Sequence, residues 1–80
     1  MRNIKDYVRQ NDFKMLLKNN IIHIENFTDI KNISEKEISI YNGNIKVLIK
    51  GSKLQVRKLL NDEILILGNY NNIIFEGINE

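Results

Sequence analysis

The chain has 80 residues and a formal net charge of +2, which is the size of a single domain. It contains no cysteine, so disulfides and thiolate metal sites are excluded. A zinc site would need carboxylates for most of its ligands because there is one histidine, so we expect no metal and no other cofactor.

No apolar run approaches the roughly 20 residues of a membrane span. The N-terminus has basic residues, but no apolar block of signal-peptide length follows them. We therefore expect a cytoplasmic protein with no membrane span of its own.

Residues 1–15 differ from the rest and form a leader or a short helix. Four apolar residues would share one helical face: Ile4, Tyr7, Val8 and Met15. Asn11 and Asp12 interrupt that face, so a partly ordered leader fits as well. We place a single domain at residues 16–80.

Short aliphatic runs cut by Gly, Asn and Asp then predict antiparallel strands joined by tight turns. Residues 21–26 form a first strand and 27–33 a second extended segment. Ser34 and Glu37 fit a capping box, but a β-type run follows, so we predict a turn. After residues 38–41, Asn42-Gly43 predicts a type I′ turn, because both residues tolerate positive φ.

Residues 45–50 alternate, with Ile45, Val47 and Ile49 on the buried face and Lys46, Leu48 and Lys50 on the other. Gly51-Ser52 predicts a type II′ turn into a strand over 54–57, and residues 59–62 close that hairpin. Residues 64–67 and 73–75 are apolar on both faces, which predicts a central strand or an interface. Gly68 is either a turn residue or a kink in one long strand.

These elements predict an all-β fold: six or seven short antiparallel strands in a meander, curled into a sandwich or open barrel. The doubly apolar strands exceed what one sheet of this size covers. We therefore predict self-association or a protein partner along that surface.

Candidate chemistry is sparse. His23 has no fixed acid nearby except Glu25, and an ordinary half-exposed strand residue is the simpler interpretation. Gly51-Ser52-Lys53 is similar to the end of a phosphate loop, but Lys46 stands where that loop needs glycine. We expect no enzymatic activity.

Residues 45–58 contain five bases and no acid: Lys46, Lys50, Lys53, Arg57 and Lys58. On adjacent antiparallel strands, Lys46, Lys50 and Arg57 would share an outer face. Such a face is a solvated surface, a protein-partner surface or a phosphate-binding surface. It lacks the aromatic platform of single-strand binders, so nucleic acid is the least favoured. The candidate partner surface is therefore Lys46, Lys50, Arg57, Leu65 and Leu67.

A pattern of turn and core residues runs through residues 16–77. It comprises Ile24-Glu25-Asn26, Ile33-Ser34-x-x-Glu37-Ile38, Gly43-Asn44-Ile45, Ile49-Lys50-Gly51-x-x-Leu54 and Asp62-Glu63-Ile64-x-Ile66-x-Gly68. This pattern resembles the YabP/YqfC family of small sporulation proteins, closer to the YqfC branch. The run from Ile45 to Gly51 is longer than the family's strand, which predicts a bulge or a shifted register there.

The resemblance implies a non-enzymatic structural or assembly role in endospore formation, in the mother cell of a spore-forming bacterium. It also implies a protein partner, a membrane protein of the YqfD type, on which the chain would dock at the forespore membrane. The family offers no catalytic residues to carry over. The alternative is a small nucleic-acid-binding β-domain that uses the basic strands of residues 46–58.

Overall fold

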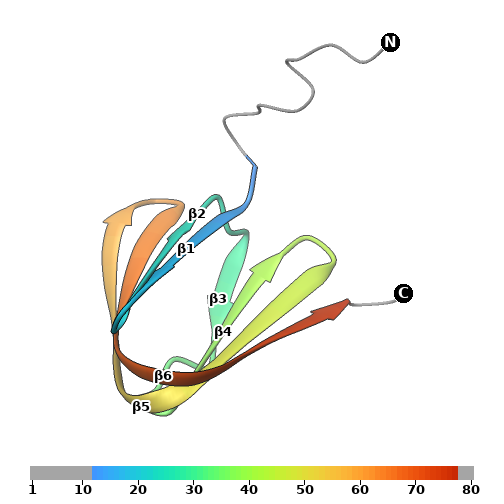
Figure 1. Cartoon of the computed structure of the whole chain (residues 1–80). Helices are drawn as coiled ribbons and strands as arrows, with labels where there is room; N and C mark the ends of the chain where they lie inside the picture. Colours follow the sequence, from blue (N-terminus) through green and yellow to red (C-terminus); the bar gives the residue numbers. More distant parts are fainter. Residues whose placement is uncertain (1–11, 78–80) are drawn as a thin grey trace, which may run out of the picture.

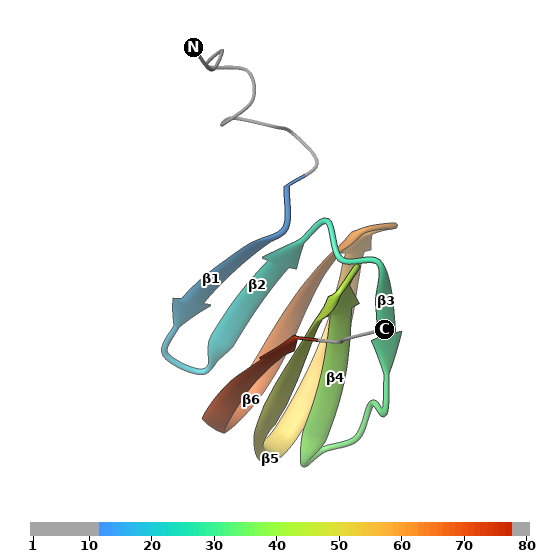
Figure 2. The ribbon, with the colours of Figure 1, turned by 90° about the vertical axis from the view of Figure 1, so that its right-hand side faces the viewer.

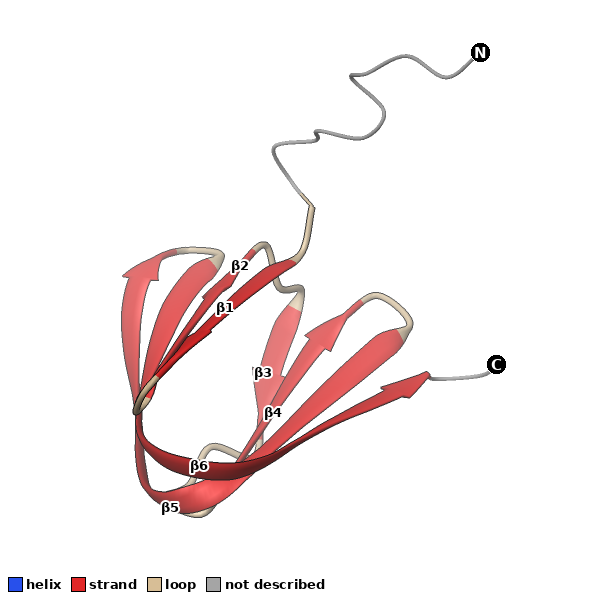
Figure 3. Ribbon diagram, in the orientation of Figure 1, coloured by secondary structure: helices blue, strands red, loops and turns tan. Residues whose placement is uncertain are grey.

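The computed structural model describes residues 12–77 and consists of strands joined by short loops (Figures 1 and 3). The strands are β1 (Lys14–Lys18), β2 (Ile21–Glu25), β3 (Asp29–Lys31), β4 (Glu37–Asn42), β5 (Ile45–Leu60) and β6 (Glu63–Gly77). Residues 12–77 include no helix long and apolar enough to cross a membrane.

All six strands belong to one antiparallel sheet, in the order β1-β2-β6-β5-β4-β3. Figure 2 shows this order from β1 on the left to β3 on the right. The sheet is curled and does not close on itself (Figure 1). Its six antiparallel strands confirm the predicted all-β class. Strands β3 to β6 form a meander, whereas β2 pairs with β6 and not with β3, so the β1–β2 hairpin joins the opposite edge.

Strands β5 and β6, of 16 and 15 residues, run together around the base of the molecule and rise on its two sides (Figure 1). They divide the sheet into two layers. The first layer contains β1, β2, residues 63–67 of β6 and residues 55–60 of β5. The second layer contains β3, β4, residues 45–50 of β5 and residues 70–77 of β6.

The core lies between the two layers and is almost entirely aliphatic. Nine side chains from β2, β4, β5 and β6 are at most 3% exposed: Ile22, Ile24, Ile38, Ile40, Val47, Ile49, Leu54, Ile64 and Ile66. Alternate residues of a strand point to the same side, so a period-two pattern of isoleucines delivers this core. Burying each one contributes roughly 1.5–3 kcal/mol.

Two glycines permit the sharp bend of the long strands. A Cβ atom at Gly51 would overlap the carbonyl oxygen of Asn69, and one at Gly68 would lie 2.5 Å from the carbonyl oxygen of Lys53. Gly68 also has a φ of 129°, in a region that side chains disfavour. The register shifts beside Gly51, as expected where bulges bend a strand.

Two loops contact the backbone at this bend, the loop between β3 and β4 and the loop between β1 and β2. The backbone N–H of Gly51 donates to the carbonyl of Lys36 at 2.9 Å, and the N–H of Leu54 donates to Glu35 at 2.8 Å. The N–H of Gly68 donates to the carbonyl oxygen of Asn20 at 3.1 Å. These bonds satisfy polar groups that the bulges remove from the strand ladder, so they hold the bend in place.

The structure therefore decides what the sequence left open around the glycines. Gly68 is a kink within one long strand. The predicted turn at Gly51-Ser52 is wrong, because these residues lie inside β5, and the separate strands 45–50 and 54–57 are one. A register shift lies between Lys50 and Gly51, where the length of the run from Ile45 to Gly51 predicted a bulge or a shifted register.

The β4–β5 turn lies one residue later than predicted. Asn42 pairs with Ile45, so Gly43 and Asn44 form the loop. Only Gly43, with a φ of 57°, has positive φ there, which excludes a type I′ turn. The reason is burial: this register places Ile38 opposite Ile49 and Ile40 opposite Val47, within the core.

The sheet begins before residue 16, where the sequence placed the start of the domain. Residues 14–18 form the edge strand β1, not a helix, so the sheet begins inside the predicted leader. Phe13 and Met15 pack against the core. The rest of the predicted helix, residues 1–11, lies outside the described residues.

Candidate functional site

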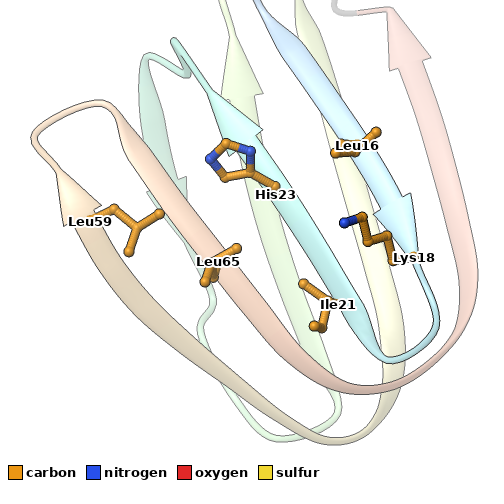
Figure 4. Close-up of a pocket in the computed structure, with 6 residues that line it drawn as sticks. All are labelled: Leu16, Lys18, Ile21, His23, Leu59 and Leu65. Carbon is orange, nitrogen blue, oxygen red and sulfur yellow. The ribbon is translucent and has the colours of Figure 1, made fainter.

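The side of the first layer that points away from the core, the first outer face, carries an open hollow of about 320 Å³. Six side chains from four strands line it: Leu16, Lys18, Ile21, His23, Leu59 and Leu65 (Figure 4). The register explains the grouping, since Leu16 of β1 and Leu65 of β6 both stand opposite His23. Directly opposed residues point to the same side of a sheet.

Apolar side chains dominate this face and remain accessible to solvent. Leu16 is 54% exposed, Leu59 44% and Ile21 36%. Leu65 and Leu67 are half-buried beside them. Exposed apolar side chains that come together from several strands are typical of an interaction surface.

The doubly apolar run of residues 64–67 is the origin of this face. The predicted central position is confirmed, because β6 lies between β2 and β5 there. Ile64 and Ile66 fill the core, so Leu65 and Leu67 must point outward. The tertiary structure covers one side of the run completely and the other side only in part.

His23 is engaged by an acid that sequence reasoning missed. Its Nε2 atom lies 2.7 Å from Oε2 of Glu63 and 3.8 Å from Oε2 of Glu25. Glu63 comes from β6, directly opposite Glu25 of β2. The predicted neighbour Glu25 is present at the longer distance. Glu63 could have been found only from the pairing of β2 with β6, which joins residues 40 positions apart.

A hydrogen-bonded His–Glu pair has the chemistry of a base with an orienting acid. The side chains that line the hollow include no serine, threonine or cysteine that would act as a nucleophile. The ligand atoms of His23, Glu25 and Glu63 lie within 4.8 Å of one another, so this group is the candidate metal-ligating cluster of residues 12–77.

The five residues of the candidate partner surface fall on two different faces. Arg57 stands opposite Leu65, and Gln55 stands opposite Leu67, so Arg57 lies on the first outer face with both leucines. Lys46 and Lys50 precede the bend and lie on the outward side of the second layer, the second outer face. The structure does not bring Arg57 together with the two lysines.

The second outer face has balanced charge. Its bases and acids are Lys31, Lys46 and Lys50 against Asp29, Glu37 and Glu76. Lys46 stands opposite Glu76, and Nζ of Lys50 lies 4.0 Å from Oε2 of Glu37. Nζ of Lys31 lies 3.9 Å from Oδ2 of Asp29. The same atom lies over the ring of Tyr41, 5.4 Å from the ring centroid. Such a mixture does not attract phosphates as a basic stripe does.

The comparisons with known proteins returned no matching family model, no matching curated protein and no matching solved structure.

Proposed function

We propose that the chain is a non-enzymatic assembly factor whose first outer face docks on a protein partner. One observation carries the proposal: side chains from four strands meet there, and three of the apolar ones are at least one-third exposed. An apolar cluster of this kind gains free energy when a partner removes it from water, roughly 25 cal/mol for each Å² buried.

The charged residues around the cluster indicate the chemistry of the partner. Lys18 lines the hollow, and Arg57 stands beside Leu65 on the same face. Lys14 occupies the same side of β1. A matching partner presents apolar side chains flanked by carboxylates, because charges of opposite sign steer association and fix orientation.

The biological setting rests on the resemblance to the YabP/YqfC family. It supports a role in endospore formation, in the mother-cell cytoplasm of a spore-forming bacterium. The partner would be a YqfD-type membrane protein, which would hold the chain at the periphery of the forespore membrane.

Deletion of the gene tests this setting. We expect unchanged vegetative growth and a loss of heat-resistant spores, because an assembly factor of sporulation is dispensable while cells divide. Slow growth with normal spore counts would contradict the proposal.

A matched pair of substitutions tests the docking face. Leu16→Glu places a charge on the first outer face, whereas Ile33→Glu places one in a loop at similar exposure, 58% against 54%. We expect only Leu16→Glu to lose co-purification of the YqfD-type protein and to fail to restore spore formation in the deletion strain. Equal behaviour of the two variants would remove the first outer face as the docking site.

Self-association is the other outcome of these experiments. Residues 69–77 of β6 pair only with β5 among the described strands, and Ile74 and Phe75 there are 39% and 61% exposed. A free, apolar strand edge is able to pair with a second chain. Sedimentation of the purified chain distinguishes self-association from docking on a different protein. A stable dimer in the absence of the partner would show that a second copy of the chain covers exposed apolar surface.

A further inference from the structure

Three potential ligands gather at one end of the first outer face, where β2 ends and β6 begins. Their side chains are partly shielded: His23 is 26% exposed, Glu25 34% and Glu63 19%. We propose that His23, Glu25 and Glu63 bind one divalent cation of the first transition series, with Zn²⁺ the best match. This inference goes beyond docking and does not depend on it. It departs from the expectation of no metal, because the pairing of β2 with β6 adds Glu63 to His23 and Glu25.

The backbone holds these residues in fixed positions. Glu25 and Glu63 are direct partners in the β2–β6 ladder, and His23 lies two residues before Glu25 on the same side. Both strands are interior to the sheet. The N–H of Asn26 donates to the carbonyl of Asp62 at 2.6 Å, which ties the two strand ends together. Ligands on paired interior strands are well preorganised for an ion.

Charge favours a cation between the two carboxylates. Like charges directly opposite one another destabilise a sheet. His23 reaches both acids, at 2.7 Å and 3.8 Å, and Lys14 stands opposite Glu25 on β1. A bound ion would replace the hydrogen bond between His23 and Glu63. Its double charge neutralises both carboxylates at once, which one lysine cannot do.

The distances suit a small ion after side-chain rotation. Ligands at about 2.0–2.1 Å from a tetrahedral zinc ion lie roughly 3.3 Å from one another. The cluster's ligand atoms are separated by 2.7 Å, 3.8 Å and at most 4.8 Å, which brackets that spacing. Bringing the three groups around one centre therefore requires ligand atoms to shift by on the order of 1 Å.

The ligand set selects the class of ion. An imidazole with two carboxylates suits Zn²⁺ and its neighbours, whereas Mg²⁺ and Ca²⁺ prefer oxygen ligands alone. His23 and Glu25 also line a second hollow of about 410 Å³ together with Lys14, Met15 and Leu16. This opening leaves the fourth coordination position to water. Leu16 and Leu65 flank His23 across the ladder.

Calorimetric titration of the untagged full chain with zinc chloride tests the site. We expect one saturable site for each chain, weakened at least about tenfold by His23→Ala and by Glu63→Gln, because each removes a ligand. Glu37→Gln is the matched control: it removes a carboxylate beside Lys50 on the second outer face and should leave affinity unchanged.

Thermal unfolding supplies a second measurement. Zinc should raise the unfolding midpoint of the wild-type chain and of Glu37→Gln, and should raise it less for Glu25→Gln and Glu63→Gln, because only binding to the folded state stabilises it. Circular dichroism checks that each variant keeps its β-sheet. Absence of saturable binding, or wild-type affinity in folded variants of all three residues, would overturn the site. Neither result bears on spore formation or on docking.

Discussion

The two outer faces of the molecule share strands β5 and β6, yet they differ in character. The first outer face has exposed leucines around a hollow and a His–Glu cluster at one end. The second outer face sets three bases against three acids, with Leu48 and Ile74 between them. Strands β5 and β6 contribute to both, and their bend near Gly51 and Gly68 separates the part beside β1 and β2 from the part beside β3 and β4.

The two outer faces differ in whether their side chains find partners within the chain. On the second outer face, cations have acids within about 4 Å or directly opposite in the ladder. On the first, the apolar side chains have no counterpart that covers them within residues 12–77. A partner therefore gains more from the first outer face.

The largest effect should come from removing the bend that creates the two faces. Gly68→Ala forces a Cβ atom to within 2.5 Å of a carbonyl oxygen at a φ of 129°, so we expect a loss of about 3–5 kcal/mol in the free energy of unfolding. Gly77→Ala is the control, since its Cβ atom would meet nothing within 4 Å. Chemical denaturation measures both. Equal denaturation midpoints would show that the bend tolerates a side chain.

Next in size is the difference between two outward leucines, Leu65 on the first outer face and Leu48 on the second. Both are half-buried on interior strands, so replacement by serine should cost each about 1–2 kcal/mol of stability. Only Leu65→Ser should weaken partner binding, by roughly tenfold or about 1.4 kcal/mol. Affinity measurement with the co-purified partner checks this. Equal losses of affinity would erase the distinction between the faces.

A smaller difference should separate the polar pairs. The half-buried bond between His23 and Glu63 is 2.7 Å long, whereas Lys50 and Glu37 lie 4.0 Å apart and about half exposed. Double-mutant cycles in chemical denaturation should give a coupling of about 1 kcal/mol for the first pair. The second should give at most about 0.5 kcal/mol. A stronger coupling for the exposed pair would reverse our ranking.

The smallest expected effect concerns nucleic acid. Because the lysines of the second outer face have acidic neighbours, we expect no binding of single-stranded DNA or RNA at low salt. Lys46→Ala with Lys50→Ala should therefore leave a fluorescence-anisotropy titration unchanged. Binding that falls steeply with added salt would restore the nucleic-acid alternative.

Local patterns were enough to predict much of the fold. Alternation in residues 21–26, 38–41 and 45–50 identified core isoleucines such as Ile22 and Ile40, because a period of two is visible in the chain itself. The turn between β5 and β6 falls within the predicted residues 59–62, because Asn and Asp there favour a turn. The sequence predicts a turn at Gly51, where the structure has a bulge, because a bulge and a turn share the same local composition.

The candidate site was much less predictable. Leu65 and Leu67 were named from their apolar run, but Arg57 was grouped with lysines that lie beyond the bend. Leu16, Ile21 and Leu59 were missed, as was Glu63 beside His23. These residues come together on one face only because β2 pairs with β6, and such a long-range register leaves no mark in a short window of sequence.

The sequence by itself determined the class of the fold: β-branched residues at a period of two, broken by Gly, Asn and Asp, specify an antiparallel sheet. It also determined that residues 64–67 need cover on both sides. Only the tertiary structure decided that β5 and β6 are single bent strands and which outer side of the sheet stays apolar. The physical reason is that alternation is encoded residue by residue, whereas register and bending follow from packing between distant segments.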